Sequence, residues 1–439
     1  MSKAPDQNLG ELRLRRPDRS QAVMKVECPD ELIPAAHPAR VVWRVVEALD
    51  LSEFHAAIKA RQGVAGRDAT DPRLLVALWL YATIRGVGSA RELSRLCVES
   101  KPYQWLCGNL SLNHHTLSDF RVAHGAALDG LLSRMVAALA GKGLVKVYRV
   151  SQDGLRMRAC AGASSFRRKQ RLGKLLEQAR EHVEQLKTLL DDPQQSAGLS
   201  QKQKAARRRA ARERQERIEA AIKTLPELEK KQEQLRKKVS KKDQAKGKLK
   251  EPRASTTDAE AKVMKMPDGG FRPAVNLQLA SDTESRAIVG VEVTSSGVDT
   301  GQAEPMRQQV ERRSGLKVHE HLLDGGYLVL DEIERAAAQD VTLYVPPKPP
   351  RNKELRGSEY EPRPGDSEVI KAWRARMGSE AGKEVYKQRA STSETVNADA
   401  REHRNLDRLT VRGLGKARCV GLWFALAYNI MHFAGALAG

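Results

Sequence analysis

Residues 382–403 read GKEVYKQRASTSETVNADAREH, and the rest of the chain is organised around this stretch. On a helix with about 100° per residue, Tyr386, Arg389, Glu394 and Arg401 fall within an arc of about 140°. This face carries an aromatic ring, two guanidinium groups and a carboxylate, so it suits a polar cleft better than a core. A carboxylate beside two cations is expected to ionise readily and to suit a hard metal ion, whereas the arginines suit phosphate. A solvated helix with charge pairs three residues apart is the alternative.

Two aspartates follow apolar runs that we expect to be strands. Asp153 ends the β-branched run in VKVYRVSQDG, with the strand predicted over 146–152. Asp324 ends the run in HEHLLDGGY, where a glycine pair allows a sharp turn. Two aspartates at strand ends and a glutamate on a later helix can converge to hold two Mg²⁺ ions for phosphoryl transfer. Asp153, Asp324 and Glu394 are therefore the candidate catalytic and metal-binding residues.

These residues resemble those of a known family, the DDE transposases of bacterial insertion sequences. The relevant branch has a Tyr-x2-Arg…Glu-x6-Lys/Arg signature, which here is Tyr386, Arg389, Glu394 and Arg401, with one residue more between arginine and glutamate than in its commonest form. The resemblance extends through DGLRMRACAGASSFRR at 153–168, DGGY at 324–327 and RLTVRGLGKAR at 408–418.

The resemblance implies a transposase that cleaves the ends of an insertion sequence and transfers the strands into target DNA. It implies an RNase H-like active site with two Mg²⁺ or Mn²⁺ ions, and double-stranded DNA, as terminal inverted repeats and target, for a partner. A homodimer is expected because two ends must meet in one complex. Tyr386, Arg389 and Arg401 are expected to bind DNA phosphates or a displaced base. Two alternatives stay open: a catalytically inactive or domesticated DNA-binding protein, and an RNase H-fold nuclease that does not transpose.

The composition favours a nucleic-acid partner over a membrane. The 439 residues include 76 Lys and Arg against 55 Asp and Glu, a net charge of +21. The cysteines form no C-x-x-C pair and are expected to be reduced thiols of a cytoplasmic, nucleoid-associated protein without a signal peptide. Residues 420–439 are long enough to cross a bilayer, but Asn429 and His432 would be costly in lipid, so we expect a buried closing helix and no membrane.

The order of predicted elements gives a helix-rich α+β protein. Residues 1–25 are predicted to be flexible, and residues 26–140 to form a helical, helix-turn-helix-like domain that binds DNA ends, with Arg121 facing outward toward DNA. A helical cap packed on the catalytic domain is the alternative for this region. Residues 141–439 are predicted to form an RNase H-like domain with a mixed five-stranded sheet, an assignment that leans on the resemblance.

Residues 167–252 are predicted to interrupt the catalytic domain. Residues 167–250 contain 26 Lys and Arg against 12 Asp and Glu. Apolar residues at three- and four-residue steps on either side of DDPQQSAG (191–198) predict an antiparallel, coiled-coil-like helical hairpin. Its dense basic segment indicates a DNA-binding arm or a dimerisation element, with a solvated spacer as the alternative. The basic segment comprises Lys202, Lys204, Arg207, Arg208 and Arg209.

Two further side chains are candidates for DNA contact. Arg412 continues the basic theme beyond the glutamate helix. Trp373 lies among basic residues, where stacking on a base and packing into the core are both open.

Overall fold

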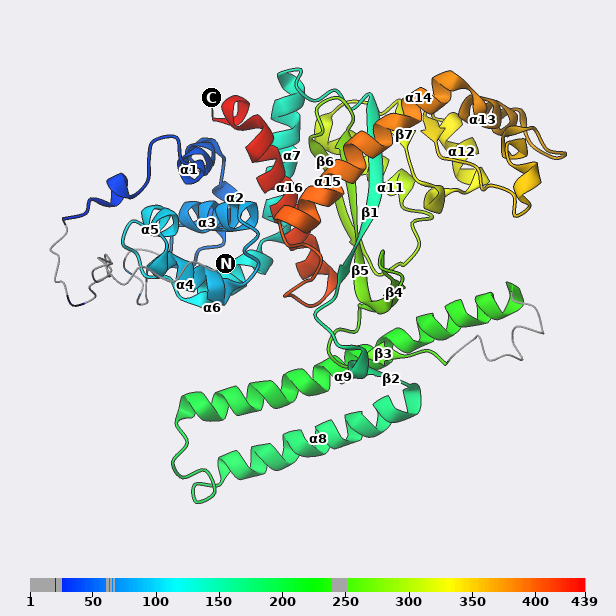
Figure 1. The fold of residues 1–439 in the computed structure, drawn as a ribbon. Helices are drawn as coiled ribbons and strands as arrows, with labels where there is room; N and C mark the ends of the chain where they lie inside the picture. Colours follow the sequence, from blue (N-terminus) through cyan, green and yellow to red (C-terminus); the bar gives the residue numbers. More distant parts are fainter. Residues whose placement is uncertain are drawn as a thin grey trace, which may run out of the picture.

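The structure, a computed structural model, describes residue 20 and residues 26–60, 63, 65, 68–238 and 251–438. The flexible segment predicted over 1–25 lies outside the described residues apart from residue 20, as do residues 239–250 of the insertion. The described chain combines many helices with one mixed sheet, which confirms the predicted α+β fold. Figure 1 shows the N-terminal helices on one side of the sheet and, beneath it, the hairpin of α8 (Lys169–Asp191) and α9 (Gln201–Lys238).

The N-terminal region is helical, and polar residues begin several of its helices. Asp71 accepts a hydrogen bond from the backbone N–H of Arg73 at 2.8 Å, and Pro72 occupies the first helical position. Ser89 accepts from the N–H of Glu92 at 3.4 Å. The described elements are η1 (Pro29–Leu32), α1 (Pro38–Ala48), α2 (Ser52–Ala56), α3 (Pro72–Ile84), α4 (Ala90–Glu99), α5 (Lys101–Cys107), α6 (His114–Ala123) and α7 (Gly125–Gly141).

The sheet has the strand order β4-β5-β1-β7-β8, with β6 also paired to β5. β5 pairs antiparallel with β1, β4 and β6, whereas β1, β7 and β8 are parallel. The predicted mixed sheet of five strands is therefore present, and the short β4 extends the edge of β5 that β6 also uses. The strands are β1 (Arg149–Arg158), β4 (Lys262–Lys265), β5 (Phe271–Asp282), β6 (Ile288–Thr294), β7 (Glu320–Leu322) and β8 (Thr342–Tyr344).

Helices follow the sheet strands and cover them. A helical run from α14 to η7 crosses the sheet in front of β1 (Figure 1). The described elements are α11 (Ala303–Ser314), η3 (Gly325–Tyr327), α12 (Leu330–Ala337), η4 (Lys353–Leu355), η5 (Ser358–Tyr360), α13 (Glu368–Gly378), α14 (Glu380–Arg389), the π-helix η6 (Ala390–Glu394), α15 (Thr395–Ala398), the π-helix η7 (Asp399–His403) and α16 (Leu414–Leu437).

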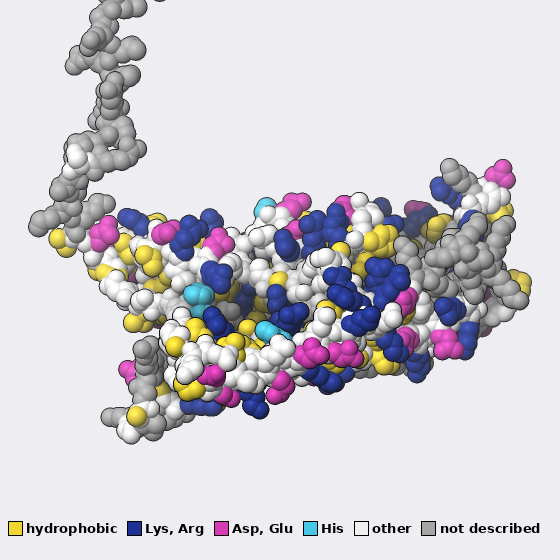
Figure 2. Space-filling model, turned by 90° about the horizontal axis from the view of Figure 1, so that it is seen from below, with side chains coloured by type: hydrophobic (Ala, Val, Ile, Leu, Met, Phe, Trp, Pro, Cys, Tyr) yellow, Lys and Arg dark blue, Asp and Glu magenta, His cyan; other side chains and the backbone are white. Residues whose placement is uncertain are grey.

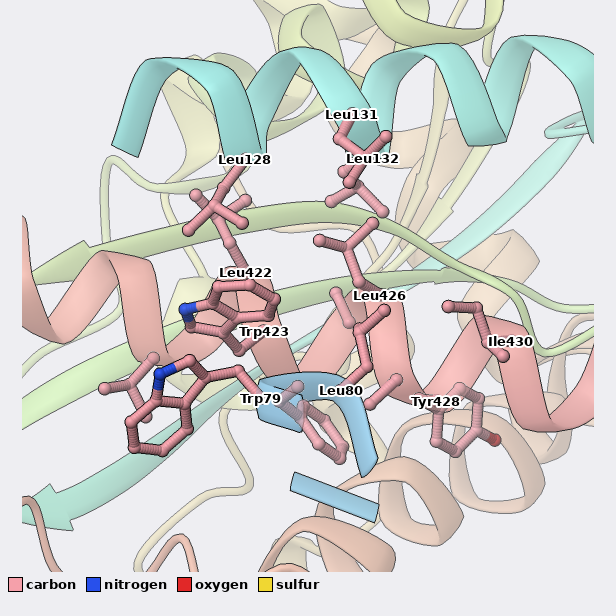
Figure 3. Packing of buried hydrophobic residues seen from close by; sticks show 14 of the residues in the cluster. Trp79, Leu80, Leu128, Leu131, Leu132, Leu422, Trp423, Leu426, Tyr428 and Ile430 are labelled. Atoms are coloured by element: carbon pink, nitrogen blue, oxygen red, sulfur yellow. The ribbon is translucent and has the colours of Figure 1, made fainter. Parts of the chain in front are cut away.

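Helix α16 lies at the centre of the main core. Figure 3 shows Leu422, Trp423 and Leu426 of α16 between leucines of α7 and the side chains of Trp79 and Leu80 on α3. By length and composition α16 could span a membrane, but 61% of its most apolar window is buried in the protein. The expected closing helix is therefore present, and it packs against protein.

A polar residue inside α16 is satisfied by the sheet. The Asn429 side chain is fully buried, accepts from the N–H of Ile288 at 2.8 Å and donates to its carbonyl oxygen at 2.9 Å. These two bonds pair the amide with the first residue of β6, so the asparagine that would be costly in lipid holds α16 on the sheet.

The helical N-terminal region and the sheet share this core. One continuous cluster of buried apolar side chains includes residues of α1, α3 and α7 together with β1, β5, β6 and α16. The predicted boundary near residue 140 therefore crosses a packed interior, and the N-terminal helices are fixed relative to the sheet.

The insertion forms the predicted antiparallel helical hairpin. Helices α8 (Lys169–Asp191) and α9 (Gln201–Lys238) pack through a small apolar core of their own that includes Leu172, Ile218 and Leu225. A short turn, η2 (Ala163–Ser165), and the two-residue strands β2 (Phe166–Arg167) and β3 (Ala254–Ser255) form its base, where β2 and β3 pair antiparallel. Pro226 lies inside α9 and does not end the helix.

Candidate active site

Asp153 lies in the middle of a strand, and its predicted position at a strand end was wrong. Strand β1 continues to Arg158 because its antiparallel pairing with β5 is unbroken from Val150 to Arg158, with Asp153 opposite Leu279. Gly154 is part of this ladder, opposite Gln278. The backbone N–H of Gly154 donates to Asp153 Oδ1 at 2.8 Å. The strand therefore fixes the Asp153 carboxylate on the sheet surface.

Asp324 lies just beyond the end of β7, as predicted. It caps the turn η3, where its Oδ1 accepts from the backbone N–H of Gly326 at 2.7 Å. The Tyr386 hydroxyl donates to the carbonyl oxygen of Leu323 at 3.1 Å. Burial raises the pKa of Tyr386, which keeps the hydroxyl protonated and able to donate. Tyr386 thus holds the residue next to Asp324, and its contact with DNA stays a prediction.

Glu394 ends a π-helical segment, η6, inserted between α14 and α15. In a π-helix the hydrogen bonds join residues five apart instead of four, so each hydrogen-bonded loop encloses one residue more than in an α-helix. This extra residue accounts for the longer spacing between Arg389 and Glu394. Ser393 lies against β1, where its hydroxyl is 2.5 Å from that of Ser151. The π-helix therefore places Glu394 over the sheet although the signature is one residue longer.

Arg389 links two of the three predicted acids. Its side chain is 13% exposed, and its guanidinium lies 3.2 Å from Asp153 Oδ2 and 3.5 Å from Glu394 Oε1. Asn397, which sequence reasoning missed, donates to Asp153 Oδ2 at 3.1 Å. Helical spacing could have indicated it, because Asn397 comes three residues after Glu394. Asp153 and Glu394 are therefore brought to one place, with a cation between them.

Burial decides the charge of Asp153. Removal from water is the largest effect, and together with the nearby Asp324 and Asp299 carboxylates it raises the pKa of Asp153 to a net value of about 6. Arg389 and the N–H of Gly154 oppose this rise without cancelling it.

A buried polar network beneath the acids was not predicted. Asp299 Oδ1 accepts from the side-chain amides of Asn276 at 2.7 Å and Gln278 at 2.8 Å. The Tyr327 hydroxyl donates to Gln278 Oε1, and Gln152 Nε2 donates to the same oxygen at 2.8 Å. The available signal was the pair of amide side chains in VNLQL (275–279), which lie on one face of β5.

The donor atoms suit a hard divalent cation, since carboxylate oxygens are the ligands that Mg²⁺ prefers. The Asp324 and Asp299 carboxylates are close enough to contribute to the raised pKa of Asp153, so acidic side chains gather here. Within the described ranges, no group of three or more His, Cys, Asp or Glu side chains is close enough to hold a metal ion. Arg389 occupies the space between Asp153 and Glu394 in this structure.

The basic residues predicted to contact DNA differ in their exposure to solvent. Arg121 is buried, lies over the Trp79 ring and donates to the Gly88 carbonyl oxygen and to Thr410 Oγ1, so its predicted outward position was wrong. The reason is tertiary packing: Arg121 lies on a face of α6 that is covered by Trp79 of α3 and by the segments that carry Gly88 and Thr410. Residues at or near the surface are Arg401, Arg412, Lys202, Lys204, Arg207, Arg208 and Arg209.

Two members of the basic hairpin segment are engaged within the hairpin. Lys204 Nζ donates to Ser196 Oγ at 2.7 Å, and Arg208 pairs with Asp191. Figure 2, which looks onto the hairpin side of the molecule, shows Lys and Arg side chains gathered along the middle of this face.

Trp373 packs in the interior. It is 1% exposed, and its Nε1 donates to the carbonyl oxygen of Val345 at 3.1 Å. Of the two open interpretations, packing is confirmed.

Comparison with known families identifies the chain. A family model described as a transposase domain, DUF772, matches residues 27–123, from η1 to the end of α6. A second, described as a transposase DDE domain, matches residues 349–434, a range that includes the signature residues and most of α16. The chain belongs to the DDE transposases of insertion sequences. Asp153 and Asp324 of this transposase lie outside the two matched ranges. The chain matched neither a curated protein nor a solved structure.

Proposed function

We propose that this transposase cleaves DNA at the ends of an insertion sequence and joins the freed ends to target DNA in one active site. The observation that supports this is the convergence of β1, the end of β7 and the η6 helix, which carry Asp153, Asp324 and Glu394. Asp153 and Glu394 contact the same guanidinium, and Asp324 is close enough to raise the pKa of Asp153.

We assign the binding of divalent metal to these three carboxylates. Bound Mg²⁺ or Mn²⁺ supplies Lewis-acid activation of the attacking oxygen and stabilisation of the leaving oxygen. The chain itself prepares the carboxylates: the N–H of Gly326 orients Asp324, and Asn397 and the N–H of Gly154 orient Asp153. Tyr386 anchors the strand end that carries Asp324.

Arg389 has two partners in the proposed mechanism. In this structure its guanidinium compensates Asp153 and Glu394. A DNA phosphate entering the site offers a competing anion of the geometry that guanidinium binds well. We propose that Arg389 clamps this phosphate, with Arg401 on the same helical run as a second cation.

The hairpin would extend the DNA-binding surface. Phosphate contacts supply most of the affinity of such surfaces and need exposed cations. Lys202, Arg207 and Arg209 are exposed on α9. We propose that these residues contact DNA backbone, that the N-terminal helices bind the terminal repeats, and that two copies of the chain join two ends.

The test uses a labelled duplex of the DNA that flanks the gene, with Mg²⁺ or Mn²⁺. We expect nicking at the element end that is lost in Asp153→Asn, Asp324→Asn and Glu394→Gln, whereas binding of the same duplex is largely kept because these residues contribute little phosphate contact. A variant that still nicks would remove its residue from the catalytic set. Tight binding without nicking by the wild type would favour a DNA-binding protein, and nicking unrelated to the element ends would favour a different nuclease.

A further inference from the structure

A fourth acid lies between the two aspartates of the site. Asp299 is in the segment between β6 and α11 and is 7% exposed, although none of the sequence patterns indicated it. Asp299 lies close to both segments that carry the other aspartates, strand β1 and turn η3, as two glycines show. Gly154 follows Asp153 directly, and Gly326 comes two residues after Asp324.

The space beside Gly154 and Gly326 shows how closely the Asp299 carboxylate approaches these two residues. A Cβ atom at position 154 would lie 2.6 Å from Asp299 Oδ1, and one at position 326 would lie 3.3 Å from Asp299 Oδ2 and 2.8 Å from Asp324 Oδ1. The first distance is shorter than van der Waals contact allows, so residue 154 must lack a side chain while Asp299 keeps this position. Asp299 Oδ2 and Asp324 Oδ1 flank the same point.

The two oxygens of Asp299 have different surroundings. Oδ1 accepts two amide hydrogen bonds, from Asn276 and Gln278, which fix the plane of the carboxylate. Oδ2 faces Gly326, and its nearest cation is Arg156, whose guanidinium lies 3.9 Å away. A carboxylate that two amides fix through one oxygen, and whose other oxygen lies beside Asp324, is arranged as a ligand with its supporting contacts already in place.

A second observation at this place concerns Asn276. Its side chain is fully buried, and its Oδ1 has no hydrogen-bond donor among the described residues. That oxygen would lie 2.7 Å from a Cβ at position 154, so it borders the same space as Asp299. Buried carbonyl oxygens are almost always satisfied by a donor, a water or a cation. An unsatisfied oxygen beside the carboxylates therefore indicates a missing polar or cationic partner.

We propose that Asp299 is a fourth carboxylate of the metal-binding site, held by β5 through Oδ1 and presenting Oδ2 beside Asp324. The proposal rests on the proposed function, because it adds a ligand to the site assigned to Asp153, Asp324 and Glu394. The chemical class of the ligand is a hard divalent cation, Mg²⁺ or Mn²⁺.

The first experiment measures Mn²⁺ binding to the full-length protein without DNA, by calorimetry, in Asp299→Asn. Asparagine keeps an oxygen that can accept from Asn276 and Gln278 but removes the negative charge. We expect Mn²⁺ affinity to fall at least about tenfold. The matched control is Asp340→Asn, whose side chain is 89% exposed, and we expect it to leave binding unchanged. Wild-type affinity in Asp299→Asn would overturn the proposal and leave Asp299 a structural acceptor only.

A second measurement needs no variant. Fe²⁺ bound in place of Mn²⁺, with ascorbate and peroxide, generates radicals that cut the polypeptide next to the metal. We expect cuts near residue 299 as well as near residues 153 and 324. Cuts at 153 and 324 without one at 299 would overturn the role of Asp299 alone. Absence of cuts at 153 and 324, with unchanged Mn²⁺ binding in Asp324→Asn, would overturn the proposed metal site itself.

Discussion

Substitution of Asp153 by asparagine should make the metal-free protein more stable. Burial raises the pKa of Asp153 from 3.8 to about 6, so folding favours the protonated carboxyl over the carboxylate. The corresponding stabilisation is fully present below the unfolded pKa, near pH 4, and is lost as the pH rises through about 6. Asparagine has the shape of the neutral acid and carries no charge, so the variant does not lose stability as the pH rises.

The size of the effect follows from the shift. A difference of roughly two pKa units, at about 1.4 kcal/mol each, corresponds to about 3 kcal/mol. This value already includes the opposing attraction of Arg389. At pH 7.5 with EDTA, Asp153→Asn should therefore gain up to about 3 kcal/mol in free energy of unfolding over the wild type. Near pH 4 the gain should vanish.

The assay is denaturant unfolding followed by tryptophan fluorescence across this pH range. Asp340→Asn removes an exposed acid and should show no comparable pH-dependent gain. Added Mg²⁺ should reduce the difference in free energy of unfolding between the variant and the wild type at pH 7.5, because it stabilises only the wild type. The reasoning would be refuted if Asp153→Asn were no more stable than the wild type at pH 7.5, or if its gain in stability were the same at pH 4. Either result would show that Arg389 and the hydrogen bonds to the Asp153 carboxylate outweigh the cost of its burial.

Three other predictions concern the helix, its anchor and the hairpin. Deletion of Ser391 should convert the π-helical turn to an α-helical one and keep the affinity for Mn²⁺ within a few-fold of wild type. Deletion of Glu384 from the regular helix α14 should instead abolish Mn²⁺ binding. If calorimetry shows the same loss of Mn²⁺ affinity for both deletions, η6 does not absorb the additional residue. Tyr386→Phe loses the bond to the Leu323 carbonyl and should cost about 1 kcal/mol of stability and weaken Mn²⁺ binding, and an unchanged protein would show that the strand end needs no anchor. Replacing the exposed hairpin cations by alanine should reduce the slope of log affinity for duplex DNA against log salt by up to about three, and an unchanged slope would favour a spacer; these cations are Lys202, Arg207 and Arg209.

Periodicity and residue type predicted the architecture well. The helical hairpin and the closing helix were both visible in the sequence, because each depends on apolar spacing within a short segment. Asn429 shows that the same reasoning extends to polar residues. Because its side chain would be costly to place in lipid, the helix was predicted to be buried in the protein, and Ile288 of β6 supplies both hydrogen-bond partners.

The misses depend on contacts between distant segments. The sequence around Asp153 could not show that β1 stays paired with β5 beyond Gly154. The charge of Arg121 could not show that its guanidinium donates hydrogen bonds to Gly88 and Thr410 inside the protein. Asp299 lies in a segment with no recognisable motif, and it is held at the site by Asn276 and Gln278, which are more than 20 residues away in the sequence. A helical wheel with fixed 100° steps could not foresee two π-helical turns within 382–403.

The most direct test of the central claim is strand transfer by the purified transposase. A labelled element end with a free 3′-hydroxyl is incubated with a circular target DNA and Mg²⁺ or Mn²⁺, beside Asp324→Asn as the matched control. The account predicts metal-dependent joined products that are absent with Asp324→Asn, although that variant still binds the end. Joining by Asp324→Asn, or tight binding with no joining by the wild type under either metal at low salt, would contradict it.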